Sequence, residues 1–85
     1  MEKIEMIITI KCFSFVRYAL DQKKLVLDLE DGTTTESLEK IVREMANGKL
    51  DDIILRTAVN QSYTIQSVEL KDGDEVVFIP PVQGG

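Results

Sequence analysis

The segment that most constrains this 85-residue chain is a nearly continuous apolar run close to its end, from Val76 to Ile79. Such runs are typical of strands at the centre of a sheet, where side chains are covered on both faces. The preceding residues, from Lys71 to Asp74, have turn chemistry, because Gly73 accepts a positive φ and aspartate caps the bend. The chain is therefore expected to place its last strand in the middle of a sheet.

The first third of the chain predicts an antiparallel pair of strands. Residues 4–12 alternate between two faces, and the alternation returns from Lys24 to Glu30, where three leucines face inward. The connection between them, from Phe13 to Leu20, is rich in aromatic residues and irregular, so it predicts a wide turn or a short helical piece. The two strands are expected to form a hairpin with this long connection.

The next segment predicts a helix of about three turns. Thr33, Thr34 and Thr35 offer an N-cap, and Asn47-Gly48 is a typical stop. Between these signals, apolar residues recur at the spacing of one helical face, and charged residues occupy the other face. The apolar set consists of Leu38, Ile41, Val42 and Met45.

The remaining segments complete the predicted sheet. Ile53 to Val59 is strand-like, Asn60-Gln61 forms a turn, and Tyr63 to Leu70 is expected to contain a short strand or a helical turn. One helix must then cover one face of a mixed sheet, which is an α+β fold.

A central last strand should lie parallel to the first strand. That is the β-grasp, or ubiquitin-like, arrangement, and it leaves the chain end pointing away from the body. We expect one β-grasp domain over residues 1–79 and an extended tail over residues 80–85.

Charge and composition narrow the classes of partner. The chain has 10 basic and 15 acidic residues, a net charge of −5 and no cluster of Lys or Arg, so nucleic acid is not an expected partner. An acidic domain is more readily attracted to a basic patch on another protein. Neither a membrane-spanning stretch nor a signal peptide is recognised. A lone cysteine, Cys12, is compatible with a reducing compartment, so a cytoplasmic location is expected.

The residue types that most catalytic chemistry needs are missing. Without histidine, the chain lacks the commonest general base and metal ligand, and a zinc site is unexpected. No glycine-rich phosphate loop is present. The pairs Asp51-Asp52 and Asp72/Asp74 are better explained by a connection and a turn than by catalysis, and Cys12 by core packing. The chain is expected to bind no cofactor or metal and not to be catalytic alone.

The C-terminal tail carries the strongest functional signal. It consists of Pro80, Pro81, Val82, Gln83, Gly84 and Gly85. The prolines keep the chain extended where it leaves the last strand, and the glycines allow the terminal carboxylate to enter a narrow slot. A floppy end or a cloning remnant is the alternative interpretation. Nothing else in the chain can activate the Gly85 carboxylate, so an ATP-using partner enzyme is implied.

Four segments form a fairly specific combination. They are Ala58 to Gln61, Leu70 to Val76, Phe78 to Val82, and Gly84-Gly85. Together they resemble the small, sulfur-carrying subunit of molybdopterin synthase, in the MoaD/ThiS sulfur-carrier group. The N-terminal half matches more loosely, since Cys12 and Ser14 stand where the family commonly has Phe and Ala.

This resemblance implies a defined activity. An adenylating enzyme related to the ubiquitin-activating enzymes would use ATP to form an acyl-adenylate on Gly85. A sulfur donor protein would then convert it to a thiocarboxylate. The large subunit of molybdopterin synthase would receive the tail, and the sulfur would pass to cyclic pyranopterin monophosphate. Two transfers per pterin imply a heterotetramer of two small and two large subunits.

The resemblance also implies docking residues on the body of the domain. Phe13, Tyr63 and Ile79 match apolar positions that the family uses against its large subunit, with core packing as the alternative for each. Arg17 is either a solvated side chain or a partner for an acidic group.

Two other kinds of function stay open. A thiamine-pathway sulfur carrier or a ubiquitin-like modifier joined to lysines would also end in Gly-Gly, although Pro80-Pro81 favours the molybdopterin branch over the thiamine branch. The other alternative is a non-covalent β-grasp interaction module whose tail has no chemical role.

Overall fold

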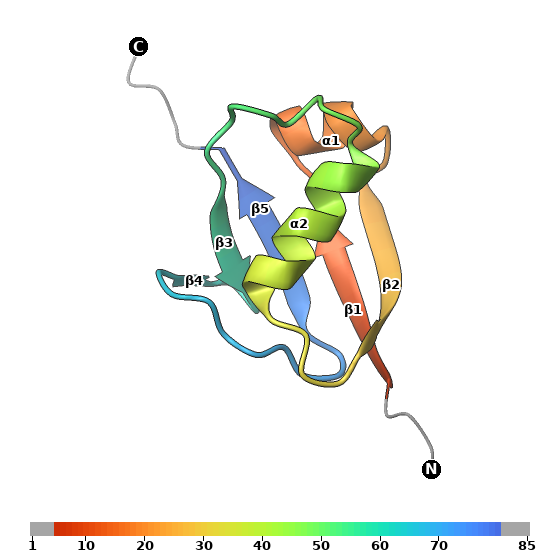
Figure 1. The fold of residues 1–85 in the computed structure, drawn as a ribbon, viewed down its shortest axis with the longest axis vertical. Coiled ribbons are helices and arrows are strands. Elements are labelled where there is room, and N and C mark those ends of the chain that lie inside the picture. Colours follow the sequence, from red (N-terminus) through yellow and green to blue (C-terminus); the bar gives the residue numbers. More distant parts are fainter. Residues whose placement is uncertain (1–4, 81–85) are drawn as a thin grey trace.

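The structure, a computed structural model, describes residues 5–80; residues 1–4 and 81–85 lie outside the described part. Figure 1 shows one five-stranded sheet, a longer helix across one face and a shorter helix at one end. Neither helix in residues 5–80 is long and apolar enough to cross a membrane. The elements are β1 (Glu5–Lys11), α1 (Ser14–Leu20), β2 (Lys24–Glu30), α2 (Thr35–Met45), β3 (Arg56–Val59), β4 (Ser62–Thr64) and β5 (Glu75–Ile79).

The last strand is central, as predicted. The strand order is β2-β1-β5-β3-β4. β5 runs parallel to β1, with Val76 opposite Ile10, and antiparallel to β3, with Val77 opposite Ala58. β1 and β2 form the predicted antiparallel hairpin, and the connection between them contains the short helix α1. The α+β, β-grasp arrangement is confirmed.

The hydrophobic core lies between the sheet and α2 (Figure 1). Alternate residues of the two central strands point into it, and Ile8, Ile10 and Phe78 are fully buried. Leu38 and Val42 of α2 are equally buried. Because burial of each such side chain contributes about 1.5–3 kcal/mol, slipping β5 by one residue would expose its core side chains and is strongly disfavoured.

The helix α2 begins and ends as the sequence predicts. Oγ1 of Thr34 accepts a hydrogen bond of 3.2 Å from the backbone N–H of Ser37, which caps the first turn. After the helix, Asn47 and Gly48 both have positive φ, 53° and 89°, so the chain cannot continue as a helix.

The predicted apolar face of α2 is wrong at one position. Met45 is 43% exposed, whereas Ala46 is 1% exposed. The line of closest approach to the sheet runs through Leu38, Val42 and Ala46, which are spaced by four residues. Met45 therefore lies at the flank of this line, and the small Ala46 allows the end of the helix to approach the core.

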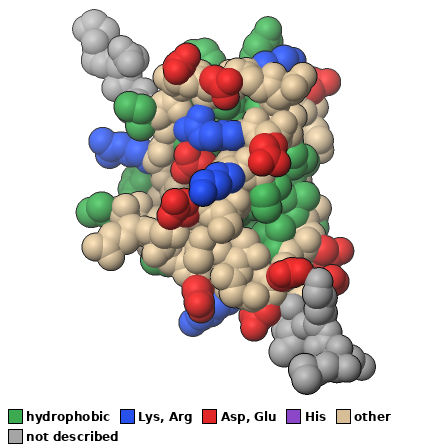
Figure 2. Space-filling model, in the orientation of Figure 1, with side chains coloured by type: hydrophobic (Ala, Val, Ile, Leu, Met, Phe, Trp, Pro, Cys, Tyr) green, Lys and Arg blue, Asp and Glu red, His purple; other side chains and the backbone are tan. Residues whose placement is uncertain are grey.

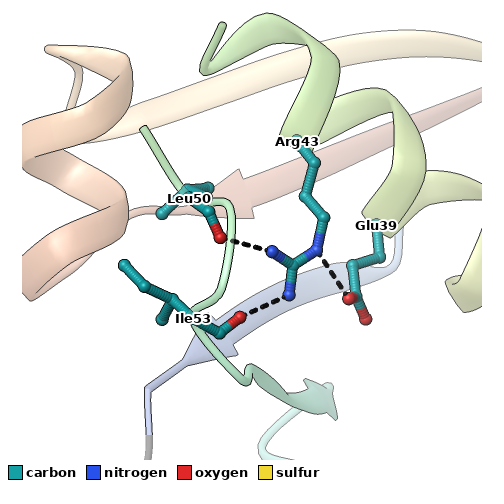
Figure 3. Close-up of polar contacts among 4 residues, drawn as sticks. All are labelled: Glu39, Arg43, Leu50 and Ile53. Atoms are coloured by element: carbon teal, nitrogen blue, oxygen red, sulfur yellow. Dashed lines mark hydrogen bonds and ion pairs between the residues drawn. The ribbon is translucent and has the colours of Figure 1, made fainter. Parts of the chain in front are cut away.

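The strand predicted from Ile53 to Val59 is shorter in the structure, since β3 begins only at Arg56. Figure 3 shows the contacts of this segment. The guanidinium of Arg43 on α2 donates hydrogen bonds to the carbonyl oxygens of Leu50 and Ile53, and a third of 2.9 Å to the carboxylate of Glu39. The carbonyl of Ile53 is thus bonded to a helix side chain, and the regular strand begins three residues later, at Arg56.

β5 is not buried equally on its two faces, which corrects the expectation from its apolar run. Val76 and Phe78 are fully buried beneath α2, whereas Glu75, Val77 and Ile79 on the opposite face are half-buried. The difference arises because α2 covers only one face of the sheet (Figure 1). We call the other side the open face.

The predicted turn from Lys71 to Asp74 is tied to the first strand. Oδ1 of Asp72 accepts a hydrogen bond of 2.7 Å from the N–H of Ile7, and the N–H of Gly73 donates one of 2.9 Å to the Ile7 carbonyl. Gly73 has a φ of 87°, as the turn requires. The turn therefore fixes where β5 starts relative to β1.

Candidate functional site

The candidate site is the end of the sheet at which β1 and β5 both finish. The two strands run in the same direction, and α1 lies at this end and contacts β5 (Figure 1). The chain leaves β5 after Ile79, and the half-buried Pro80 is the last described residue. The other tail residues predicted to be functional lie outside the described residues: Pro81, Val82, Gln83, Gly84 and Gly85. The structure thus fixes the origin of the tail at the end of the central strand.

Two of the three predicted docking residues lie at this end. Lys11 is opposite Val77 in the parallel ladder, and Phe13 and Ile79 each follow two residues later. The backbone of Phe13 is extended, with φ −128° and ψ 157°, so the alternation of the strand continues and directs both side chains to the open face. Phe13 is 53% exposed and Ile79 is half-buried, so both leave apolar surface accessible at the end of the sheet where β5 finishes.

The third predicted docking residue, Tyr63, shares the open face but lies further away. The ladders place Tyr63 opposite Ala58, and Ala58 opposite Val77. Tyr63 is therefore two strands from β5, on the edge strand β4, and it is 64% exposed. It also lines a surface hollow of about 620 Å³ between the start of α2 and the β3–β4 edge. The structure places Phe13 and Ile79 at the same end of the sheet and Tyr63 at the far side of the same face.

Positive charge gathers around a second hollow beside α1. This hollow of about 780 Å³ is lined by Arg17, Lys23 and Lys49, with Asp21 as the one acidic lining residue. The ammonium of Lys49 lies 5.9 Å from the ring centroid of Tyr18, within the range of a cation–π contact. In a chain of net charge −5, this is a local concentration of cations. Only Arg17 was singled out from the sequence, because no sequence pattern links it to Lys49.

Cys12 is confirmed as a core residue. It is 2% exposed, and burial raises the pKa of its thiol above the ordinary value. Because the thiolate is the nucleophilic form, a buried neutral thiol is poorly suited to sulfur chemistry.

The carboxylates of the turn before β5 are engaged in the backbone around them. The carboxylate of Asp74 accepts hydrogen bonds of 2.8 Å from the N–H of Lys71 and 2.9 Å from the side-chain amide of Asn60. Asp72 is bonded to β1 as described above. Over residues 5–80, no group of three His, Cys, Asp or Glu side chains is placed to hold a metal ion. The pair Asp72/Asp74 thus has a structural role in this turn.

A mixed sheet with its C-terminal strand at the centre, crossed by one helix and open on its other face, defines a β-grasp or ubiquitin-like domain. The chain belongs to the ThiS family, which it matches over residues 10–85. It is therefore a ubiquitin-like protein of the MoaD/ThiS type. A comparison with curated proteins found no match.

Solved structures with the same fold include archaeal and bacterial proteins. A putative molybdopterin converting factor, subunit 1, from Pyrococcus furiosus is 24% identical, with a TM-score of 0.81 over 91% of this chain and 99% of that one. Small archaeal modifier protein 1 from Haloferax volcanii is 15% identical, with a TM-score of 0.76 over 91% and 99%. A complex of subunits 1 and 2 of molybdopterin-converting factor from Helicobacter pylori is 23% identical, with a TM-score of 0.66 over 94% and 100%. At these identities, the likeness shows the fold.

Proposed function

We propose that this chain is the small, sulfur-carrying subunit of a molybdopterin synthase. The carboxylate of Gly85 is adenylated, converted to a thiocarboxylate, and donates its sulfur to cyclic pyranopterin monophosphate. The observation that carries the proposal is the position of β5, the central strand, which ends at Ile79 and leads directly into Pro80 and the tail. Membership of the ThiS family and the likeness to the Pyrococcus furiosus protein support it.

The chemistry of the tail requires other proteins. In adenylation, a carboxylate oxygen of Gly85 attacks the α-phosphate of ATP, and pyrophosphate leaves. Hydrosulfide supplied by a sulfur donor protein then attacks the acyl carbon, AMP leaves as the C–S bond forms, and loss of the S–H proton gives the thiocarboxylate. The chain contains no histidine, and its one thiol is buried, so we assign these steps to an adenylating enzyme related to the ubiquitin-activating enzymes and to a sulfur donor protein.

The open face around Ile79 is proposed as the docking surface for the large subunit. Insertion of the tail alone buries too little surface for a stable complex, which typically needs about 800 Å² per partner. Phe13, Ile79 and Tyr63 offer apolar surface on the same side of the sheet. The cations around Arg17 suit acidic groups of a partner. The Helicobacter pylori neighbour is a complex of two such subunits, and we expect two small and two large subunits here.

A ubiquitin-like modifier is the second candidate function. The likeness to small archaeal modifier protein 1 over nearly all of that chain favours it. A modifier uses the same acyl-adenylate, but a lysine amine of a target replaces the sulfur nucleophile and an isopeptide bond forms. A thiamine-pathway carrier would form the same thiocarboxylate but pass its sulfur to an acceptor other than the pterin. A non-covalent interaction module would form neither a thiocarboxylate nor an isopeptide bond.

Reconstitution from purified components separates these functions. The chain is incubated with an adenylating enzyme, ATP, a sulfur donor, a molybdopterin synthase large subunit and the cyclic pterin substrate, and the products are identified by mass spectrometry. We expect a C-terminal thiocarboxylate and sulfur-dependent conversion of the pterin. A chain extended by several residues after Gly85 should give neither product, and the matched control carries the same extension before Met1.

The outcomes distinguish the candidates. Conjugates on lysine residues without conversion of the pterin would favour the modifier. Formation of the thiocarboxylate with no transfer to the pterin would favour the thiamine branch. Adenylation that fails for the unmodified chain under all conditions would leave the non-covalent module and contradict the proposal.

A further inference from the structure

Charge is distributed unevenly between the two ends of the sheet. Because β1 and β5 are parallel, one end holds the starts of both strands, and the other, which we call the tail end, holds their last residues and the exit of the chain (Figure 1). Figure 2 shows acidic side chains gathered at the end opposite the tail end, at the bottom of the view. They include Glu5, Asp31, Glu69, Asp72 and Asp74. Lys71 is the one cation that the described chain places among them.

Exposed cations gather at the tail end instead. Arg56, the first residue of β3, lies directly opposite Ile79 in the antiparallel ladder, so both side chains are on the open face. Lys24, the first residue of β2, lies opposite Lys11 at the last residue of β1. Three more cations line the hollow beside α1. We call the following five exposed residues the tail-end cations: Arg17, Lys23, Lys24, Lys49 and Arg56.

The tail-end cations are not neutralised by other described residues. The ion pairs within residues 5–80 are Lys11 with Glu75, at 3.3 Å, and Arg43 with Glu39, at 2.9 Å. Lys11 is thus already paired, and none of the five tail-end cations belongs to either pair. Lys49 lies over the ring of a tyrosine, a contact that leaves its charge in place. The five cations are therefore available to an acidic partner.

The two ends of the sheet are far enough apart to act separately. The acidic residues at the tail end are fewer than its cations, namely Asp21, Asp51 and Asp52. The seven residues of β1 span about 20 Å at the usual rise of a strand. At about 0.1 M salt the screening length is only about 10 Å. A partner that approaches the tail end therefore meets a local excess of positive charge, although the net charge of the chain is −5.

The length of the tail indicates which kind of anion these cations meet. Gly85 is six residues beyond Ile79. An extended chain spans about 3.3–3.6 Å per residue, so a tail inserted into an active site carries its carboxylate roughly 20 Å from the sheet. The phosphates of ATP lie where that carboxylate reacts, too far away for the tail-end cations to contact. The cations instead meet protein at the mouth of the slot, where the complementary groups are Asp and Glu side chains.

We propose that the tail-end cations dock the chain on an acidic surface around the tail slot of the adenylating enzyme. In the proposed function, on which this site depends, that enzyme receives the tail of each chain and must then release it. Contacts between exposed charges mainly raise the rate of association, which suits such a brief encounter. The large subunit is instead assigned the apolar surface of the open face, which suits a lasting complex.

The rate of association between the full chain and the adenylating enzyme, without ATP, tests the site. It is measured by stopped-flow fluorescence with a dye on the enzyme. Between about 0.05 and 0.5 M salt, we expect the association rate constant of the wild type to fall about tenfold or more. The double variant Lys49→Glu/Arg56→Glu should associate about tenfold more slowly than the wild type at about 0.1 M salt, and nearly equally at 0.5 M.

Lys71→Glu is the control for a charge reversal at the opposite end of the sheet. It should associate within about twofold of the wild type at about 0.1 M salt, because screening separates the two ends. A single reversal at the tail end, Lys49→Glu, changes the net charge by the same amount and should slow association several-fold. Association of the double variant with a molybdopterin synthase large subunit should be slowed much less. Thermal melting first establishes that every variant is folded.

The outcomes separate this docking site from the proposed function. Association that does not depend on salt, or equal slowing by Lys71→Glu and Lys49→Glu, would overturn the docking site, and sulfur loading of Gly85 would still support the proposed function. Equal slowing of the double variant with the large subunit would contradict the assignment to the adenylating enzyme. If the wild-type chain does not bind the adenylating enzyme at any salt concentration, both the docking site and the proposed function are wrong.

Discussion

The guanidinium of Arg43 donates a hydrogen bond of 2.7 Å to the carbonyl oxygen of Ile53, so the helix α2 and the segment leading into β3 are joined by one side chain (Figure 3). The same guanidinium bonds the carbonyl of Leu50 and forms an ion pair of 2.9 Å with Glu39. One planar, charged group thus orients the connection from α2 to the sheet on which the candidate site is built.

Replacing Arg43 should destabilise the fold more than its position on a helix surface suggests. Arg43→Met keeps the aliphatic stem but leaves the carbonyls of Leu50 and Ile53 without this donor. We expect a loss of about 1.5–3 kcal/mol in the free energy of unfolding, measured in urea. Arg43→Lys should recover only part of it, since an ammonium cannot reproduce the fork. Lys40→Met on the same helix is the control and should change stability by less than about 0.5 kcal/mol. Equal effects at the two positions would contradict the account.

The turn before β5 needs glycine at position 73 for its backbone conformation and not for lack of space. Its φ is 87°, and a Cβ added there would meet no atom within 4 Å, so Gly73→Ala tests conformation without a steric clash. We expect a loss of about 1–2 kcal/mol, seen as a lower urea midpoint with unchanged slope. Gly73→Asn should lose less, because asparagine tolerates the left-handed region. If the asparagine variant is the less stable of the two, the loss is not conformational.

The buried thiol of Cys12 predicts how stability changes with pH. Burial raises the pKa of Cys12 above its ordinary value of 9.0, so the thiol ionises in the unfolded chain before it ionises in the folded one. Its stabilising contribution is complete below pH 9 and is lost as the pH rises toward the folded-state pKa, by at most about 1.4 kcal/mol per pH unit. Urea unfolding at pH 8, 9 and 10 measures this loss.

Cys12→Ser removes the titrating thiol and serves as the comparison. We expect it to be about 1–3 kcal/mol less stable at neutral pH, because a hydroxyl is then buried, and to lose less stability between pH 8 and 10. Sulfur loading of Gly85 should be unchanged. A folded serine variant that cannot carry sulfur would show that the thiol has a chemical role.

Ile79 is the residue through which the docking surface is most directly tested. Ile79→Asp places a charge on the half-buried position beside the tail, and we expect the affinity for a molybdopterin synthase large subunit to fall by several kcal/mol if this side chain is buried in the complex. Ile65→Asp is the control, because Ile65 is fully exposed outside the strands. Calorimetric titration of both folded variants decides the point, and unchanged affinity for Ile79→Asp would remove Ile79 from the docking face.

The arrangement of the sheet was predictable because it follows from local patterns. The apolar run before Ile79 identified the central strand, and the alternation between Lys24 and Glu30 identified the hairpin partner of β1. Where the prediction failed, a distant side chain contacts the segment. The guanidinium of Arg43 donates a hydrogen bond to the carbonyl of Ile53, inside the segment expected to be a strand. The residue pattern of that segment cannot reveal a contact with a distant helix.

The residues of the candidate site were also only partly predictable from the sequence. Phe13, Tyr63 and Ile79 were predicted as docking residues, and the structure places all three on the open face, with their roles still to be tested. The cationic hollow beside α1 could not be predicted from the sequence. Lys49 and Arg17 line the same hollow only because the chain after α2 passes close to α1.

The central claim is that the carboxylate of Gly85 becomes a thiocarboxylate. The most direct measurement is the intact mass of the chain recovered from cells that make the molybdenum cofactor, compared with a chain lacking Gly85. The account predicts a fraction of the complete chain heavier by the difference between one sulfur and one oxygen atom, located by fragmentation at the C-terminus and absent from the shortened chain. A complete chain that never carries this mass, or a shortened chain that carries it equally, would contradict the account.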